Sequence, residues 1–183
     1  MTYCALGALS LLGKLPSGTS CQNININAAS TSTPIINLPP IIKWLVDRQV
    51  PYQPSPSEDN DNDEVSTLPT PSDLPPTIAG FQGRAGKLAD TCYSFWVGGS
   101  LDILGHSSLI NQPLNREFLV GKTQHLIGGF GKLPGVEYRP DILHSYMGLV
   151  GLSIMGEEGL KRVDSALCVS VEARERVRGW RWF

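Results

Sequence analysis

The sequence predicts an all-α fold built from repeated pairs of helices. Placing Asp90 on Asp141 aligns the residues that follow them, which gives a repeat of about fifty residues. A glycine-rich loop precedes each aspartate, at residues 80–84 and 128–132. Alternating β-branched patterns, which would favour strands, are few. Because one such unit cannot bury its apolar face alone, we expect the units to stack or to close into a ring.

Three segments are predicted to form the inner helices of successive units. Residues 91–104 and 142–155 carry apolar side chains on nearly all faces, which is typical of helices buried on all sides. Residues 2–12 match residues 145–155 and are predicted to be the same element.

The ends of the two later inner helices carry recognisable capping residues. Asp90 and Asp141 stand immediately before these helices, where an N-cap residue belongs. Gly105 and Gly156 follow the last apolar turns, where a C-terminal glycine is expected.

The remaining segments are outer helices and insertions. Residues 41–50 and 115–125 mix apolar and polar side chains and are predicted to form outer helices. Residues 16–40 are rich in Ser, Thr, Asn and Pro, whereas residues 51–79 contain seven prolines and an acidic run. Such compositions bury too little apolar surface to order the chain, so we predict disordered, low-complexity insertions without chemistry. The domain is expected to span 1–175, followed by a tail of unknown role at 176–183.

Composition narrows the class of protein. The formal net charge of -2 argues against nucleic acid or an anionic membrane as the main partner. No apolar run approaches the length of a membrane span, and the apolar opening lacks the basic leader of a signal peptide. The four cysteines are irregularly spaced, which favours reduced thiols and a cytoplasmic location.

A carboxylate, a thiol and an imidazole form a candidate metal site. Asp90 and Cys92 lie at the start of one inner helix, and His144 lies near the start of the next. If the inner helices run parallel, the three side chains converge at one rim. Such a mixed set suits zinc, and three protein ligands leave the open position of a catalytic site. A helix-capping aspartate and an ordinary buried cysteine are the alternative interpretation.

Arg84 and Lys87 precede the carboxylate, and Tyr93 adds a hydroxyl after the thiol. Guanidinium and ammonium groups beside a metal favour the binding of an anion such as a phosphate. Standing alone, the same pair would be a solvated basic turn.

Four motifs together resemble those of protein prenyltransferase β subunits. They are Gly-Phe-Gln-Gly-Arg, Lys-x-x-Asp-Thr-Cys-Tyr-Ser-Phe-Trp, Gly-Gly-Phe-Gly-Lys and Pro-Asp-Ile-Leu-His-Ser-Tyr, within a resemblance that runs from Thr2 to about Ala173 apart from the insertions. The resemblance implies an α–α toroid, here a partial ring, whose funnel holds an isoprenoid diphosphate. It also implies a heterodimer with a helical-repeat α subunit.

The resemblance assigns roles to individual residues. One zinc per chain would be held by Asp90, Cys92 and His144 and would bind the cysteine of a C-terminal CaaX motif, as in small GTPases. No catalytic residue beyond this metal site is implied. The isoprenoid diphosphate would be bound by Arg84, Lys87, Tyr93 and Lys132, and Trp96 would line the isoprenoid pocket.

The type I geranylgeranyl branch is favoured over its relatives. Farnesyltransferase relatives have an aspartate that assists magnesium where this chain has Lys132, so magnesium is expected to be dispensable. The Rab-specific branch has a Gly-Glu-Glu like residues 156–158, but residues 140–146 resemble type I more closely.

Two further alternatives concern the whole chain. The sequence opens in mid-motif, without the family's His-Gly-Gly segment, so we expect an N-terminally truncated chain that is inactive alone. A non-catalytic helical-repeat module would not need to keep the three candidate ligands. A terpene cyclase would need an Asp-rich catalytic motif. The acidic run of this chain lies in a low-complexity insertion, which argues against that class of enzyme.

Overall fold

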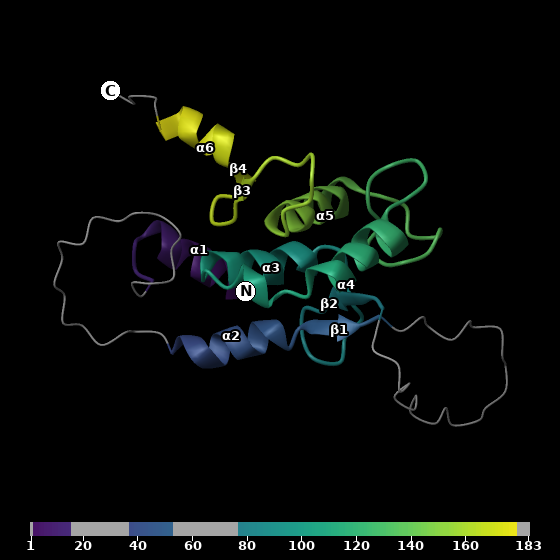
Figure 1. Cartoon of the computed structure of the whole chain (residues 1–183), viewed down its shortest axis with the longest axis horizontal. Helices are drawn as coiled ribbons and strands as arrows, with labels where there is room; N and C mark the ends of the chain where they lie inside the picture. Colours follow the sequence, from purple (N-terminus) through teal and green to yellow (C-terminus); the bar gives the residue numbers. More distant parts are fainter. Residues whose placement is uncertain (1, 16–36, 53–76, 179–183) are drawn as a thin grey trace.

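The computed structural model of the chain describes residues 2–15, 37–52 and 77–178. Helix α3 lies at the centre and contacts α1, α2 and α5 (Figure 1). The helices are α1 (Thr2–Leu11), α2 (Leu38–Val46), α3 (Tyr93–Ile103), α4 (Gln112–Arg116), α5 (Ile142–Ile154) and α6 (Val171–Arg178), with a 3-10 turn η1 (Ser107–Leu109) and a π-helical segment η2 (Glu117–Thr123). The strands are β1 (Gln49–Pro51), β2 (Ala79–Phe81), β3 (Val163–Asp164) and β4 (Val169–Ser170).

The three predicted inner helices are confirmed as α1, α3 and α5. Phe95 and Leu101 of α3 are completely buried between their neighbours. Glycines bring α5 close to α3, because a Cβ atom at Gly151 would come within 2.9 Å of the Ser94 Cβ atom. On the other side, the Tyr3 ring of α1 packs on Phe95 with centroids 4.8 Å apart. The apolar all-round pattern is matched by burial on nearly all sides in α3. For α5 this part of the prediction is wrong, because one face is buried while Ile142, Leu143 and Leu149 are exposed.

One of the two predicted aspartate caps is correct. Asp141 caps α5, since its Oδ1 atom accepts the backbone N–H of His144 at 2.9 Å. The prediction of Asp90 as an N-cap is wrong, because α3 begins at Tyr93 and Cys92 holds the cap position. The Asp90 N–H donates to the Phe81 carbonyl at 2.9 Å, which fixes Asp90 in the approach to the helix. Gly105 and Gly156 adopt the expected left-handed conformation, with φ of 75° and 79°.

The boundaries around the first outer helix need correction. Helix α2 begins at Leu38 and ends at Val46, with prolines in its first turn where the missing N–H is not needed. Pro51 and Ala79, expected in an insertion, pair in the antiparallel β1–β2 ribbon. The remaining residues of the predicted insertions, 16–36 and 53–76, lie outside the described residues.

The second outer helix is interrupted. The predicted helix over 115–125 appears as α4 followed by the wider turns of η2. The wider turns place Phe118, Leu119 and Thr123 all on the buried side. Asn115 is also buried and accepts a hydrogen bond from the Ser94 hydroxyl at 3.1 Å. The outer layer is thereby anchored on α3.

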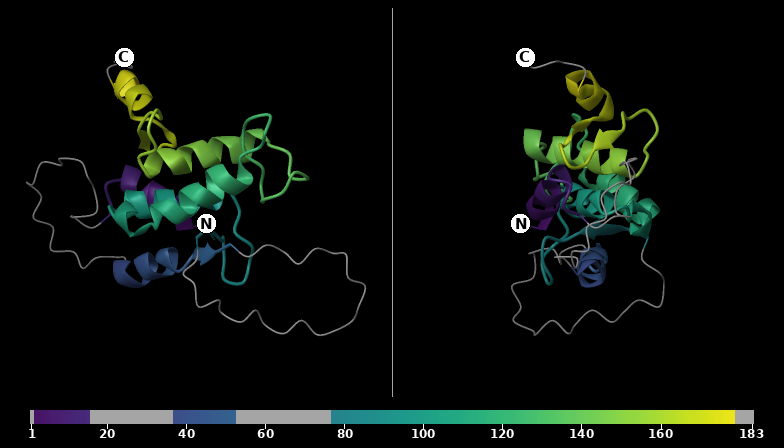
Figure 2. Two further views of the ribbon diagram at one scale, coloured as in Figure 1. Left: turned by 45° about the vertical axis from the view of Figure 1, so that its right-hand side comes forward. Right: turned by 90° about the vertical axis from the view of Figure 1, so that its left-hand side faces the viewer.

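The β3–β4 hairpin lies between α5 and α6 (Figure 2), and hydrogen bonds join it to all three inner helices. The Tyr3 hydroxyl donates to the Ser165 carbonyl at 2.7 Å, and the Ser165 hydroxyl donates to Asp102 at 2.6 Å. The Tyr146 hydroxyl of α5 donates to the Cys168 carbonyl at 2.6 Å. Helix α6 continues through Arg178, across the expected domain boundary. Within the described ranges, no helix is long and apolar enough to cross a membrane.

Candidate metal centre

Asp90, Cys92 and His144 meet at one point. Their ligand atoms all lie within 4.8 Å of one another, and the His144 Nε2 atom is 3.4 Å from Asp90 Oδ1. Asp90 and Cys92 are buried, and the His144 side chain is only 11% exposed. In the part of the chain that the structure describes, no other histidine, cysteine and carboxylate residues form such a cluster. The predicted convergence of these three side chains is therefore observed.

Hydrogen bonds between loops hold the cluster in place. The Thr91 N–H donates to the Lys132 carbonyl at 3.0 Å, and the Thr91 hydroxyl donates to the Gly131 carbonyl at 2.6 Å. These bonds join the turn before α3 to the loop that leads into α5. A Cβ atom at Gly148 would lie 3.2 Å from Thr91 Cγ2, so glycine permits this close approach. The ligands of two successive repeats thus belong to one rigid unit.

Asp141 orients His144 as well as capping α5. Its Oδ2 atom lies 2.5 Å from His144 Nδ1, while Oδ1 accepts the His144 backbone N–H. These bonds, the backbone one first, hold the pKa of the Asp141 carboxyl below its usual value. A proton held on Nδ1 leaves the lone pair of Nε2, on the side of Asp90, free to bind a metal. This arrangement is usual around metal-binding histidines. Sequence reasoning missed this role, although an aspartate three residues before a candidate histidine ligand is the signal.

A positive charge would stabilise the cluster electrostatically. Burial, together with the neighbouring Asp90 carboxylate, raises the pKa of the Cys92 thiol far above its usual value. The Trp96 indole and the Lys132 ammonium act on that pKa in the opposite sense. A divalent cation among the three donors would offset the carboxylate and favour the thiolate.

The donor set fits zinc. Oxygen, sulfur and nitrogen donors bind zinc at about 2.0 to 2.3 Å, and three protein ligands leave one position open. A shift of roughly an ångström per side chain would bring donors spaced by up to 4.8 Å onto one ion. Soft sulfur disfavours magnesium and calcium at this place.

The other predicted site residues lie at different depths. The Lys132 side chain is exposed, and its backbone carbonyl accepts the Thr91 N–H at 3.0 Å. Trp96 is half-buried, with its ring 5.1 Å from that of Tyr3 and 5.2 Å from that of Phe95. Both residues therefore adjoin the cluster.

The basic loop before Asp90 is more open. Arg84 and Lys87 are exposed, and the Lys87 N–H donates to the Arg84 carbonyl at 3.3 Å. The Tyr93 ring packs against Gly83, where a Cβ atom would come within 2.2 Å of the tyrosine hydroxyl oxygen. Glycine at 83 therefore lets the Tyr93 hydroxyl lie beside this basic loop. Among the described residues, no ion pair involves Arg84, Lys87 or Lys132.

Comparison with known proteins decides the family. Residues 1–169 match the family described as the prenyltransferase alpha-alpha toroid domain. The chain belongs to this family. It is 33% identical over 167 residues to the geranylgeranyl transferase type-1 subunit beta of Arabidopsis thaliana, and 32% identical over 183 residues to that of Dictyostelium discoideum. These matches cover 91% and 100% of this chain.

A solved structure agrees. The Candida albicans protein geranylgeranyltransferase-I complexed with GGPP matches 97% of this chain with a TM-score of 0.66 and 28% identity. The farnesyltransferase subunit beta of Schizosaccharomyces pombe is also similar, with 33% identity over 83% of this chain. The predicted toroid fold and the resemblance to type I β subunits are thereby confirmed. The chain spans 34% of the length of the Arabidopsis relative, 38% of the Dictyostelium relative and 42% of the solved Candida chain.

Proposed function

We propose that this chain provides the metal-binding and diphosphate-binding part of a zinc-dependent protein geranylgeranyltransferase type I β subunit. The enzyme would transfer a geranylgeranyl group from its diphosphate to the cysteine thiol of C-terminal CaaX motifs ending in leucine. The observation that carries the proposal is the convergence of Asp90, Cys92 and His144, next to the loop in which the Lys132 carbonyl accepts the Thr91 N–H. Similarity to type I β subunits over nearly the whole chain supports the same branch.

Each residue has a defined task in this reaction. Asp90, Cys92 and His144 would hold one zinc ion, with Asp141 orienting the histidine. Bound zinc would keep the acceptor thiol deprotonated and so supply a nucleophile at neutral pH. Because the acceptor cysteine itself attacks the isoprenoid carbon, no protein nucleophile is needed.

The basic residues would act on the leaving group. As the bond to the first isoprenoid carbon breaks, negative charge grows on the diphosphate. The exposed Arg84, Lys87 and Lys132 side chains and the Tyr93 hydroxyl would bind it and stabilise that charge where it develops. Trp96, packed edge-on against Phe95 and Tyr3, would offer an apolar surface to the isoprenoid.

The partner and location follow from the same proposal. The working enzyme would be a cytoplasmic heterodimer with a prenyltransferase α subunit. Lys132 would replace magnesium at the diphosphate, so transfer by the zinc-loaded enzyme should persist in a magnesium-free buffer.

The test uses the assembled enzyme with a labelled CaaX peptide. We expect faster transfer from geranylgeranyl than from farnesyl diphosphate, without added magnesium. Lys132→Asp should slow transfer about a hundredfold or more and make it magnesium-dependent, since one charge-stabilising donor contributes a few kcal/mol. A wild-type enzyme that strictly requires magnesium, or that prefers farnesyl diphosphate, would contradict the type I assignment.

A further inference from the structure

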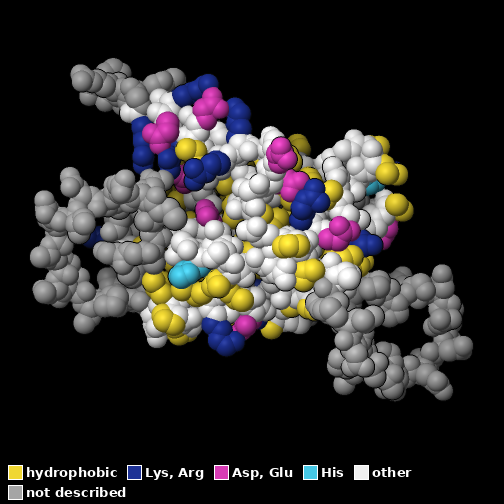
Figure 3. All heavy atoms as spheres, in the orientation of Figure 1, with side chains coloured by type: hydrophobic (Ala, Val, Ile, Leu, Met, Phe, Trp, Pro, Cys, Tyr) yellow, Lys and Arg dark blue, Asp and Glu magenta, His cyan; other side chains and the backbone are white. Residues whose placement is uncertain are grey.

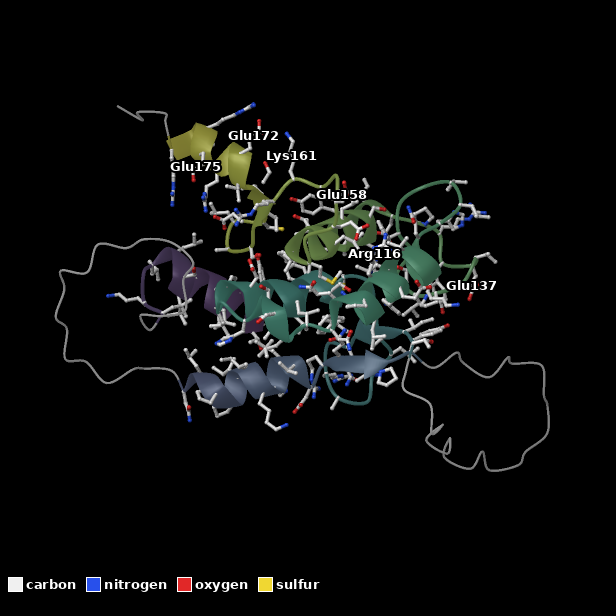
Figure 4. All side chains as sticks on the ribbon, viewed as in Figure 1. Arg116, Glu137, Glu158, Lys161, Glu172 and Glu175 are labelled. Carbon is white, nitrogen blue, oxygen red and sulfur yellow. The ribbon has the colours of Figure 1, made fainter. Side chains whose placement is uncertain are left out.

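A pocket of about 420 Å³ opens beside the candidate metal centre. Its lining comes from the β1 end at residues 50–52, the segment 82–89 and the loop 133–138. Tyr52, Leu88, Leu133 and Tyr138 give it mostly apolar walls. Lys87 and Glu137 contribute one charge of each sign. Glu137 projects at the same end of the molecule as β1 and β2 (Figure 4).

Two of the segments that line the pocket run directly into the candidate metal centre. Leu88 and Ala89 line the pocket and directly precede Asp90. Leu133 and Pro134 line it from the other side and follow Lys132, whose carbonyl accepts the Thr91 N–H. The pocket lining is therefore separated from the candidate metal ligands by only a few residues of the chain.

The pocket is formed in advance of any ligand. The buried Gln82 side chain accepts the Lys87 N–H at 3.2 Å and so holds the 82–87 turn. The Gln82 N–H donates to the Arg48 carbonyl at 2.9 Å, and the Tyr52 N–H donates to the Ile78 carbonyl at 3.0 Å. Such fixed walls reduce the ordering cost of binding.

The position of the pocket indicates which kind of ligand it can bind. None of its lining residues belongs to α1, α3 or α5, the inner helices against which an isoprenoid would lie. Leu88 and Tyr138, at its walls, are 64% and 37% exposed, so the pocket opens to solvent. It is therefore suited to a polypeptide that arrives from outside and ends at the metal.

We propose that this pocket binds an apolar or aromatic side chain of the protein substrate, from the few residues that precede the acceptor cysteine. The proposal rests on the function proposed above. Three extended residues span about 10 Å, which is enough to connect a cysteine at the metal to the adjoining pocket. Only three residues follow the cysteine in a CaaX motif, so the body of the substrate must leave the site on the preceding side.

The experiment measures peptide binding to the assembled, zinc-loaded enzyme. Fluorescent peptides ending in a CaaL motif carry either Phe or Gly at one of the four positions before the cysteine. We expect Phe at one position to tighten binding about tenfold over Gly, the effect of burying a large apolar side chain. Tyr138→Ala should abolish this difference. Val136→Ala is the matched control, because Val136 lies in the same loop, is 80% exposed and does not line the pocket.

A second measurement needs no variant. A photoreactive phenylalanine analogue at the preferred position should crosslink to residues 133–138 or 86–89 of the wild-type enzyme. Equal binding of all Phe and Gly peptides, or crosslinks only to other regions, would overturn the pocket assignment. A peptide with serine in place of cysteine serves as the reference for the proposed function. If it binds as tightly as the cysteine peptide, the metal-site proposal fails, whatever the pocket variants do.

Discussion

At His144, two aspartates act on the two ring nitrogens in different ways. Asp141 accepts from Nδ1, whereas Nε2 points towards Asp90 and Cys92. This division fixes the tautomer that a metal ligand needs. Asp141 therefore both orients the His144 ring and caps α5. A substitution can separate these two contributions.

Asp141→Asn should weaken zinc binding without unfolding α5. Asparagine caps helices about as well as aspartate, so the free energy of unfolding should change by only a few tenths of a kcal/mol. Loss of the carboxylate beside Nδ1 should lower zinc affinity about 10- to 100-fold. Competition with a zinc-binding dye measures the affinity, and urea unfolding measures the stability. Unchanged zinc affinity would show that Asp141 acts only as a cap.

Cys92→Ala should remove zinc from the protein. The Cys92 sulfur is the soft donor of the cluster, and the two remaining ligands cannot hold zinc as firmly. Zinc content after dialysis, measured by mass spectrometry, should fall from about one per chain to near zero. Cys4→Ala is the matched control, since Cys4 is exposed on α1 and should not affect metal content. Retention of zinc by the Cys92 variant would disprove the ligand assignment.

At the level of elements, small residues set the distance between α3 and α5. Gly151 faces Ser94 so closely that a methyl group there would push the helices apart. Gly98, within α3, has only an ordinary contact at 3.5 Å from Ile110 Cδ1. The two glycines therefore differ in whether a side chain can be accepted.

Gly151→Ala should destabilise the protein by about 1 to 3 kcal/mol, because overpacking outweighs the better helix propensity of alanine. It should also weaken zinc binding, since the candidate ligands lie at the starts of α3 and α5. Gly98→Ala should be neutral or stabilise by up to about 1 kcal/mol. Urea unfolding of both variants tests the difference. Equal effects would mean that the α3–α5 distance is not set by Gly151.

The sequence allowed the inner helices to be predicted because their apolar pattern and terminal glycines are local signals. The start of α3 was harder to predict, because Asp90 resembles Asp141 in sequence but its backbone N–H is bonded to Phe81, in the preceding strand β2. The same limitation explains why β1 and β2 were missed, since their pairing joins residues about thirty positions apart. The three candidate metal ligands could be proposed from residue type, whereas the carboxylate behind His144 required coordinates.

At the scale of the whole molecule, apolar surface remains exposed on the described residues. Leu126 and Ile127, after η2, are 97% and 80% exposed, and Ile142 of α5 is 91% exposed. Figure 3 shows hydrophobic atoms protruding at the right-hand end and along the edge of α2. Surfaces of this kind mark contacts with a partner or with further parts of a fold.

We expect residues 1–183 alone not to catalyse prenyl transfer, even when loaded with zinc. Binding an isoprenoid requires an apolar enclosure, because each buried methylene contributes about 0.8 kcal/mol only when water is excluded. This chain matches 42% of the solved relative, and its three inner helices can enclose only part of a ring. The chain should therefore bind zinc but hold geranylgeranyl diphosphate weakly. The assay supplies zinc, geranylgeranyl diphosphate and a CaaX peptide, with and without an α subunit, and uses a full-length β subunit as the positive control. Transfer by the 183-residue chain alone would show that three inner helices suffice to enclose the lipid, and would refute this prediction.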